Sequence, residues 1–107
     1  MKKIKEVRFY TDECGNNVVG RWLSKLDNRD KARIHLRLVR LEYGVYGDCK
    51  NLGGKLFELR FFFAKGYRIY FTEKENRIII LLCAGDKDTQ SKDIKTARSL
   101  AEEFRSR

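Results

Sequence analysis

The chain has 107 residues, of which 42% are hydrophobic and 36% are charged. This is enough apolar material for one modest core and too little for two, so we expect a single folded domain spanning residues 1–107. The 24 Lys and Arg residues outnumber the 15 Asp and Glu residues, and the resulting net charge of +9 favours an anionic partner such as RNA, DNA or an acidic protein segment.

Several classes of protein are disfavoured by the residues that the sequence lacks. The three cysteines form no Cys-x-x-Cys pair and there is a single histidine, so we expect reduced thiols, no disulfide framework and no metal site. The longest apolar run, residues 78–84, is too short to span a bilayer, and no apolar segment follows the basic start as it would in a secretion signal. We therefore expect a cytoplasmic protein without a membrane partner or a small-molecule cofactor.

The first half of the chain predicts one strand and two helices. Residues 4–10 alternate between apolar and charged side chains, as in an edge strand with one face in water. Apolar residues from Val18 to Leu26 recur at helical spacing, and a second helix is predicted from about Arg29 to Tyr43, ending at Gly44. Because the joint between the two helices is short, we expect them to form a helical hairpin.

The second half predicts a loop, three strands and a helix. Residues 45–55 contain several glycines and asparagines and show no periodicity, which indicates a loop. Strands are predicted over residues 56–63, 67–72 and 77–83, joined by short turns into an antiparallel meander. Apolar residues at helical spacing from Ile94 to Phe104 predict a C-terminal helix, capped by Asp88 or Thr89. This order is typical of an α+β domain with an antiparallel sheet, in which helices cover one sheet face and the other is left open.

The predicted hairpin brings basic and aromatic side chains together on that open face. Pairing Phe63 with Tyr67 sets Leu59 opposite Phe71 on the core side. Guanidinium groups bind phosphate and aromatic rings stack on unpaired bases, so the other side suits single-stranded RNA. Ordinary cross-strand pairs on a solvated sheet face explain the same pattern equally well. The residues of this patch are Glu58, Arg60, Phe62, Arg68, Tyr70 and Thr72.

Further cations lie outside the hairpin. Arginines step by four, four and three residues along the second helix and form a basic stripe, which indicates either a binding surface or a solvated helix face. The turn around Lys87 leaves the last strand and enters a helix, so its backbone donors and the lysine could hold a phosphate oxygen, although a capping turn fits as well. The stripe consists of Arg29, Arg33, Arg37 and Arg40, and Lys50 and Lys55 lie on the predicted loop.

Short motifs spread over nearly the whole chain are recognisable as a set. The longest are Gly66-Tyr67-Arg68-Ile69-Tyr70-Phe71 and Leu81-Leu82-Cys83-Ala84-Gly85-Asp86-Lys87. Shorter ones are Trp22-Leu23, Arg37-Leu38, Leu41-Glu42, Gly44, Gly47-Asp48, Glu58-Leu59-Arg60, Gln90, Lys92-Asp93-Ile94 and Ala97. Together they resemble the addiction-module killer proteins of the RelE/ParE toxin superfamily, in a HigB-like branch.

The resemblance implies a compact RelE-like fold and a toxin of a type II toxin–antitoxin module. A cognate antitoxin, usually HigA-like with a helix-turn-helix domain, would neutralise it. Many relatives cut mRNA in the ribosomal A site without a metal, by driving a 2′-oxygen against the adjacent phosphate, so the implied partners include mRNA and the ribosome. On this interpretation Arg68 stabilises the phosphate, Arg60 and Lys87 add charge, and Tyr70 or Glu58 orients or deprotonates the hydroxyl. The implied RNA- or ribosome-binding residues are Lys50, Lys55, Phe62, Arg33, Arg37 and Arg40.

The sequence departs from the family pattern near its C-terminal end. Some HigB-like ribonucleases carry histidines there and RelE carries a tyrosine, whereas this chain has Asp93 and no histidine. A recognisable catalyst is therefore missing. Two alternatives stay open: a ParE-like toxin that acts on DNA gyrase or another protein without cutting RNA, and an inert nucleic-acid-binding domain.

Overall fold

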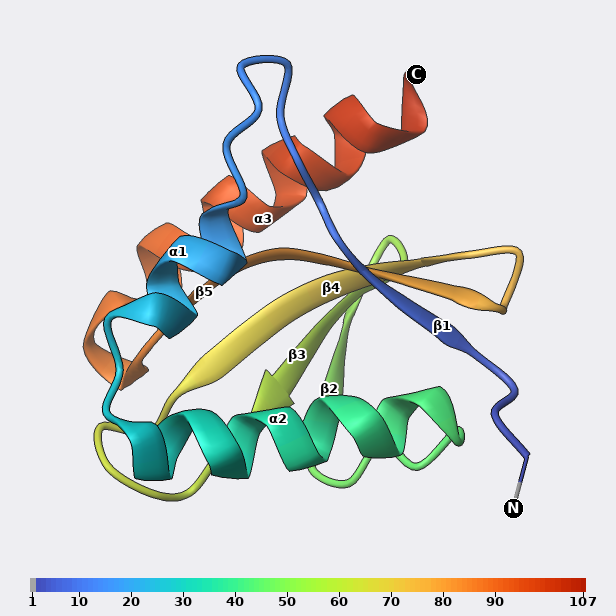
Figure 1. Ribbon diagram of the computed structural model, residues 1–107. Helices are drawn as coiled ribbons and strands as arrows, with labels where there is room; N and C mark the ends of the chain where they lie inside the picture. The colour runs from blue at the N-terminus through green and yellow to red at the C-terminus, as the bar shows by residue number, and fades with distance from the viewer. Residues whose placement is uncertain (1) are drawn as a thin grey trace.

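The computed structural model describes residues 2–107, over which five strands and three α-helices follow one another in a mixed order (Figure 1). The helices are α1 (Val18–Ser24), α2 (Asn28–Glu42) and α3 (Gln90–Arg105), and a short 3-10 helix, η1 (Lys87–Thr89), precedes α3. The strands are β1 (Glu6–Phe9), β2 (Cys49–Gly53), β3 (Leu56–Arg60), β4 (Arg68–Lys74) and β5 (Ile78–Gly85). No helix within residues 2–107 has the length and apolar character needed to cross a membrane.

The strands form one sheet in the order β1-β5-β4-β3-β2. Strands β2 to β5 are antiparallel neighbours, as the meander prediction requires, but β1 runs parallel to β5 with Val7 opposite Ile79. The α+β class is thus confirmed, while the expectation of a purely antiparallel sheet was wrong. Alternation along β1 predicts which of its faces is wet and carries no information on the direction of its partner.

Strand β2 lies where a loop was expected, so the predicted sheet was one strand short. It pairs with β3, with Cys49 opposite Leu59 and Lys50 opposite Glu58, and a register shift follows Asn51. Gly54 and Lys55 both have φ near 63°, the left-handed geometry of the tight turn that joins such a pair. Pairing with an apolar neighbour formed this strand despite residues that are individually poor strand formers.

Helices cover both faces of the sheet, with α2 on one side and α3 on the other (Figure 1). Val19 of α1 and Ile34 of α2 pack with Leu59 and Ile69, whereas Ala97 and Ala101 of α3 pack with Tyr70. The expectation of an open sheet face was therefore wrong. The small side chains of α3 allow the helix to lie close to the strands.

The helices α1 and α2 are both present, and the side chains of Asn17 and Asp27 cap them by accepting from backbone N–H groups. They do not lie side by side as the expected hairpin would. From residues 25–27 they diverge, α1 packing on β5 and α2 reaching β1 (Figure 1). Each helix buries its apolar stripe against the sheet, so little apolar surface is left for a contact between them.

The pairing of β3 with β4 differs from the predicted register by two residues. Leu59 pairs with Ile69, not with Phe71, and Arg60 lies opposite Arg68. Because strand side chains alternate with a period of two, a shift of two residues leaves each one on its predicted face. The connection is consequently longer, over residues 61–67, and it carries Phe62 out of the strand, where 87% of the side chain is exposed.

Candidate nucleic-acid interface

A pocket of about 510 Å³ opens where β3 ends, β4 begins and η1 begins. Helix α3 begins at Gln90, so it covers the middle of the strands and leaves Arg60 and Arg68 at their uncovered ends. The sheet face expected to be open is thus open at one end only. The pocket is lined by Arg60, Phe61, Phe62, Ala64, Lys65, Gly66, Arg68, Lys87 and Asp88, which include all three cations that were predicted to contact phosphate.

The two arginines occupy directly opposite positions on neighbouring strands, an arrangement that like charges oppose. Each is accompanied by a carboxylate. Arg60 donates from Nη2 to Oδ1 of Asp48 at 2.9 Å, and Arg68 places Nε 3.6 Å from Oε2 of Glu58. These carboxylates offset the repulsion, so both guanidinium groups can line one pocket.

Asp48 is in turn held by Arg37 of α2. The Arg37 guanidinium donates to the carbonyl oxygens of Arg60 at 2.8 Å, Tyr46 at 3.1 Å and Asp48 at 3.2 Å, and it lies over the Phe61 ring. Burial lowers its pKa from the ordinary arginine value. The predicted basic stripe on α2 is therefore wrong at this position, because Arg37 turns inward and ties the segment before β2 to β3. Arg29, Arg33 and Arg40 stay exposed on the helix.

Lys87 projects from a capped turn. The Asp86 side chain accepts from the N–H groups of Asp88 at 2.9 Å and Thr89 at 3.2 Å, and the Asp86 N–H donates to the Thr89 hydroxyl at 3.1 Å. The backbone donors of this turn are thus occupied, so the interpretation as a backbone phosphate site is wrong and the capping turn is confirmed. The Lys87 N–H donates to the Lys65 carbonyl, which joins η1 to the 61–67 loop. Over residues 2–107, neither lysine has a carboxylate as an ion-pair partner.

Glu58 and Tyr70 lie beneath the start of α3 and are fully buried. Tyr70 donates to Oε2 of Glu58 at 2.9 Å, and Gln90 donates to the same oxygen at 2.9 Å. Burial and the bond to Glu58 raise the pKa of the Tyr70 phenol well above its usual range, so it stays protonated. Neither side chain lines the pocket, so the roles of general base or hydroxyl-orienting group suggested for them require an access that the fold does not provide.

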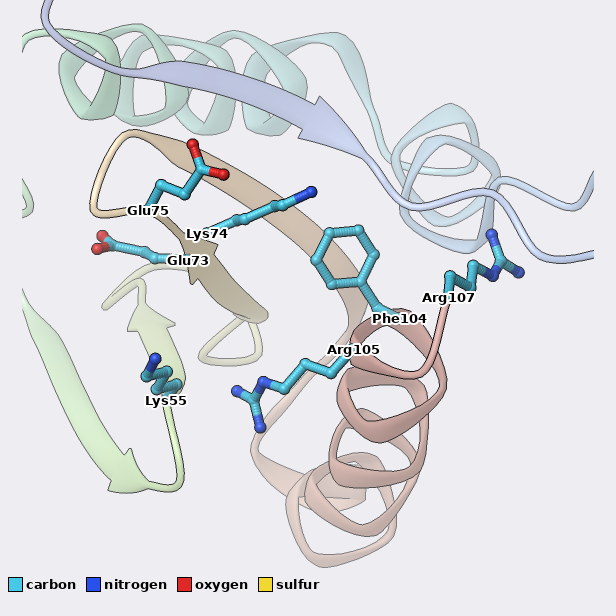
Figure 2. A pocket seen from close by; sticks show the side chains of 7 residues that line it. All are labelled: Lys55, Glu73, Lys74, Glu75, Phe104, Arg105 and Arg107. Carbon is cyan, nitrogen blue, oxygen red and sulfur yellow. The ribbon is translucent and has the colours of Figure 1, made fainter.

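Other predicted residues lie away from this pocket. Lys55 lines a separate pocket of about 290 Å³ at the opposite end of β4, where Glu73 and Glu75 lie among cations near the end of α3 (Figure 2). Lys50 is exposed on β2, and Thr72 is buried with its hydroxyl donating to the Lys55 carbonyl. An RNA-binding role for Lys50, Lys55, Arg33 and Arg40 stays a prediction.

Asp93 lies near the C-terminal end, where the resemblance led us to expect a catalyst. It packs against Gly85, where a Cβ atom would overlap its carboxylate, and it accepts a hydrogen bond from the Thr89 hydroxyl. Among residues 2–107, Asp93 is not one of those that line the pocket. Its position indicates a role in joining β5 to α3.

Sequence reasoning missed Asp48, Gln90 and Asp88 as parts of the site. Asp48 and Gln90 belong to the motifs that carried the resemblance, which was a usable signal, although nothing in those motifs said what they contact. Asp88 was considered only as a helix cap. Asp88 is the acidic residue that lines the pocket among residues 2–107, beside four lysines and arginines from β3, the 61–67 loop, β4 and η1.

Two comparisons relate this chain to known proteins. The model of the family described as "Phage derived protein Gp49-like (DUF891)" matches residues 21–105, a span that includes every residue of the pocket lining. A relative described as an uncharacterized protein, from Haemophilus influenzae, is 51% identical over 84 residues, which is 78% of this chain and 85% of the relative.

Proposed function

Since the chain belongs to the Gp49-like family of phage-derived proteins, we propose that it is the toxin of a type II toxin–antitoxin module and acts as a ribosome-dependent mRNA endoribonuclease. The observation that carries this proposal is the convergence of Arg60, Arg68, Lys65 and Lys87 on one pocket with a single lining carboxylate. An RNA phosphate is the counterpart that such a charge distribution favours.

The exposed ring of Phe62 supports a single-stranded substrate. It lines the same pocket, and because the side chain is exposed, packing in the core does not explain an aromatic residue at this position. Unpaired bases stack on aromatic side chains at about 1–3 kcal/mol per base, without regard to sequence. A nucleotide whose base stacks on Phe62 would place its phosphate beside the cations.

The proposed reaction uses the RNA itself as nucleophile and needs no metal. The 2′-oxygen attacks the adjacent phosphorus, the bond from phosphorus to the 5′-oxygen breaks, and the products are a 2′,3′-cyclic phosphate and a 5′-hydroxyl. Arg68 and Lys87 stabilise the extra negative charge of the phosphorane. Asp88, as the lining carboxylate, accepts the 2′-hydroxyl proton, and the leaving 5′-oxygen takes a proton from solvent. Glu58 and Tyr70 are too deeply buried for that step.

Partners follow from the same proposal. The exposed Arg29, Arg33 and Arg40 on α2, together with Lys50, would contact ribosomal RNA, and the net charge of +9 would speed that encounter. A cognate antitoxin, helix-turn-helix and HigA-like, would neutralise the toxin in the cytoplasm.

The test is induced expression with and without the gene that lies beside this one, followed by mapping of mRNA 5′ ends. We expect growth arrest, cuts within translated codons, and rescue by the neighbouring gene. Arg68→Ala should abolish the cuts, whereas Arg77→Ala, which removes an exposed arginine on the β4–β5 turn, should keep them. Uncut mRNA together with DNA damage would instead support the ParE-like action on gyrase. Expression without growth arrest would support an inert binding domain.

A further inference from the structure

We propose that Glu58, Tyr70 and Gln90 form a buried positioning network that sets the Arg68 guanidinium in the pocket, and that Glu58 itself takes no proton from the substrate. This inference rests on the proposed function, because it assigns the network to phosphate binding. Three elements meet at one carboxylate oxygen: Glu58 from β3, Tyr70 from β4 and Gln90 from the first turn of α3.

A carboxylate at this depth needs a cation. Burying an isolated charge is costly unless it is paired and hydrogen-bonded, and the cation beside Glu58 is Arg68, whose side chain is only 15% exposed. The distance of 3.6 Å from Nε to Oε2 is that of an ion contact rather than a hydrogen bond. Nε of Arg68 and Oε1 of Glu58 have no hydrogen-bond partner within residues 2–107. The charge of Glu58 therefore acts on Arg68 electrostatically.

This contact orients the arginine. Nε faces the buried carboxylate, and Nη1 donates to the Gly66 carbonyl at 2.7 Å. These two contacts engage Nε and Nη1, and Arg68 is held in this way in the pocket lining. An arginine held in this way is available to a phosphate without first losing side-chain freedom, which is a large part of the cost of binding.

Gln90 extends the same network to Lys87. It follows η1 directly, so its hydrogen bond to Glu58 anchors the end of the turn that carries Lys87 and Asp88. The Lys87 N–H bond to Lys65 anchors the other end. Glu58 thus determines both the direction of Arg68 and the distance between the sheet and η1, which sets the spacing of the cations on either side of the pocket.

The chain offers a matched control at the far end of β4. Glu73 also pairs with a tyrosine and a cation: Tyr46 donates to its Oε1, and Nζ of Lys5 lies 3.5 Å from its Oε2. Its side chain is 14% exposed and lines the pocket of Figure 2, away from Arg68. Glu73→Gln therefore makes the same chemical change in a similar environment without touching the proposed network.

The experiment measures binding of a short single-stranded RNA that is 2′-O-methylated, and so cannot be cleaved by 2′-oxygen attack, to the full chain. We expect Glu58→Gln to weaken this binding about tenfold, as removal of an interaction with a charged group does. Tyr70→Phe, which keeps the charge and removes one bond, should weaken it about threefold. Glu73→Gln should not change it. Adding Glu58→Gln to Arg68→Ala should have no further effect, because the network acts through the arginine.

A readout without RNA separates this inference from the proposed function. Exchange of the Arg68 Hε proton, followed by nitrogen-15 NMR, should be slow in the wild type and Tyr70→Phe and faster in Glu58→Gln. Slow exchange in a wild type that neither binds this RNA nor cuts mRNA after induced expression would overturn the function and leave the network. Unchanged RNA affinity in Glu58→Gln with loss of cleavage alone would overturn the network in favour of proton transfer, as would additive losses with Arg68→Ala. If Glu58→Gln does not fold, the RNA affinities of Tyr70→Phe and Gln90→Met, each of which removes one hydrogen bond to Glu58, decide whether the network acts on RNA binding.

Discussion

The two ends of β4 carry clusters of the same kind, a glutamate, a tyrosine and a cation, but the pockets beside them differ. At one end Glu58, Tyr70 and Arg68 lie beside a pocket in which four cations face one carboxylate. At the other end Glu73, Tyr46 and Lys5 lie beside the pocket of Figure 2, in which two glutamates face four cations.

The difference lies in the charge balance of the two pockets, because four cations and one acidic residue line the first and four cations and two glutamates line the second. Lys5 contacts Glu73, donates to the Asn76 carbonyl at 3.2 Å and lies over the Tyr46 ring. Arg105, in the pocket of Figure 2, donates to Thr72 and to a backbone carbonyl. In the other pocket, Lys65 and Lys87 have no carboxylate partner over residues 2–107, and Phe62 is exposed. The composition of a cluster therefore does not reveal a binding site, whereas the net positive charge of the pocket beside it and an exposed aromatic ring indicate one.

The largest expected difference between the clusters is in stability. Glu58→Ala leaves Tyr70, Gln90 and a largely buried Arg68 without their partner, so we expect a loss of about 3–5 kcal/mol in the free energy of unfolding. Glu73→Ala, where solvent reaches the side chain, should cost about 1–3 kcal/mol. Urea denaturation followed by circular dichroism measures both, and equal losses would contradict the comparison.

The next effect concerns Phe62 and should appear in binding alone. Phe62→Ala should weaken the binding of single-stranded RNA by about 1–3 kcal/mol, because a stacking surface is removed. The free energy of unfolding should hardly change, since 87% of the side chain is exposed in the free protein. Phe9→Ala, at another exposed aromatic, is the control and should leave affinity unchanged. A loss of stability without a loss of affinity would indicate that Phe62 packs within the fold.

A smaller effect is expected in the salt dependence of RNA affinity, which should change when lysines of one pocket are removed and not when lysines of the other are removed. Lys65→Ala and Lys87→Ala together should reduce the slope of log affinity against log salt by about 1.4, or about 0.7 for each phosphate that a lysine no longer neutralises. Lys55→Ala and Lys74→Ala together remove the same charge from the pocket of Figure 2 and should leave the slope unchanged. Equal changes in the two double variants would mean that net charge, rather than the pocket, binds RNA.

The smallest effect is one that the two clusters share. Burial and a bond to a glutamate raise the pKa values of both Tyr70 and Tyr46 above the ordinary phenol value of about 10. Below about pH 10 both phenols are protonated in the folded and unfolded chain, and stability does not depend on them. As the pH rises further, only the unfolded chain loses the protons, so stability falls. Tyr70→Phe and Tyr46→Phe should each reduce the fall measured by alkaline denaturation, and an unchanged fall would contradict the assigned burial.

Much of the architecture could be predicted from residue patterns, and the failures have identifiable causes. The helical spacing of α2 and α3 placed these helices correctly because each has one buried side, and apolar runs bounded by turn residues placed β3, β4 and β5. Strand β2 was missed because Asn51 and Gly53 are poor strand formers, and it is pairing with β3 across a tight turn that makes this segment a strand. The open face was wrong because the apolar side of α3 could not be assigned to a particular side of the sheet.

The candidate site was also predictable in part, because alternation along a strand assigns each side chain to a face. Arg60 and Arg68 share a face whatever even shift the register takes, so alternation alone places them together. Arg37 was assigned to a surface stripe by its spacing, yet it turns inward to three backbone carbonyls. Long side chains at the border of a helix face can turn either way, and spacing does not decide which.

Sequence by itself determined which side chains share a strand face and that a large excess of positive charge needs an anionic counterpart, because both depend only on residue type and period. Tertiary structure alone decided that α3 buries Glu58 and Tyr70 while leaving Arg60 and Arg68 at the open end, and that η1 brings Lys87 to them. Those outcomes depend on where a helix begins over a sheet, which is set by packing between segments far apart in the chain.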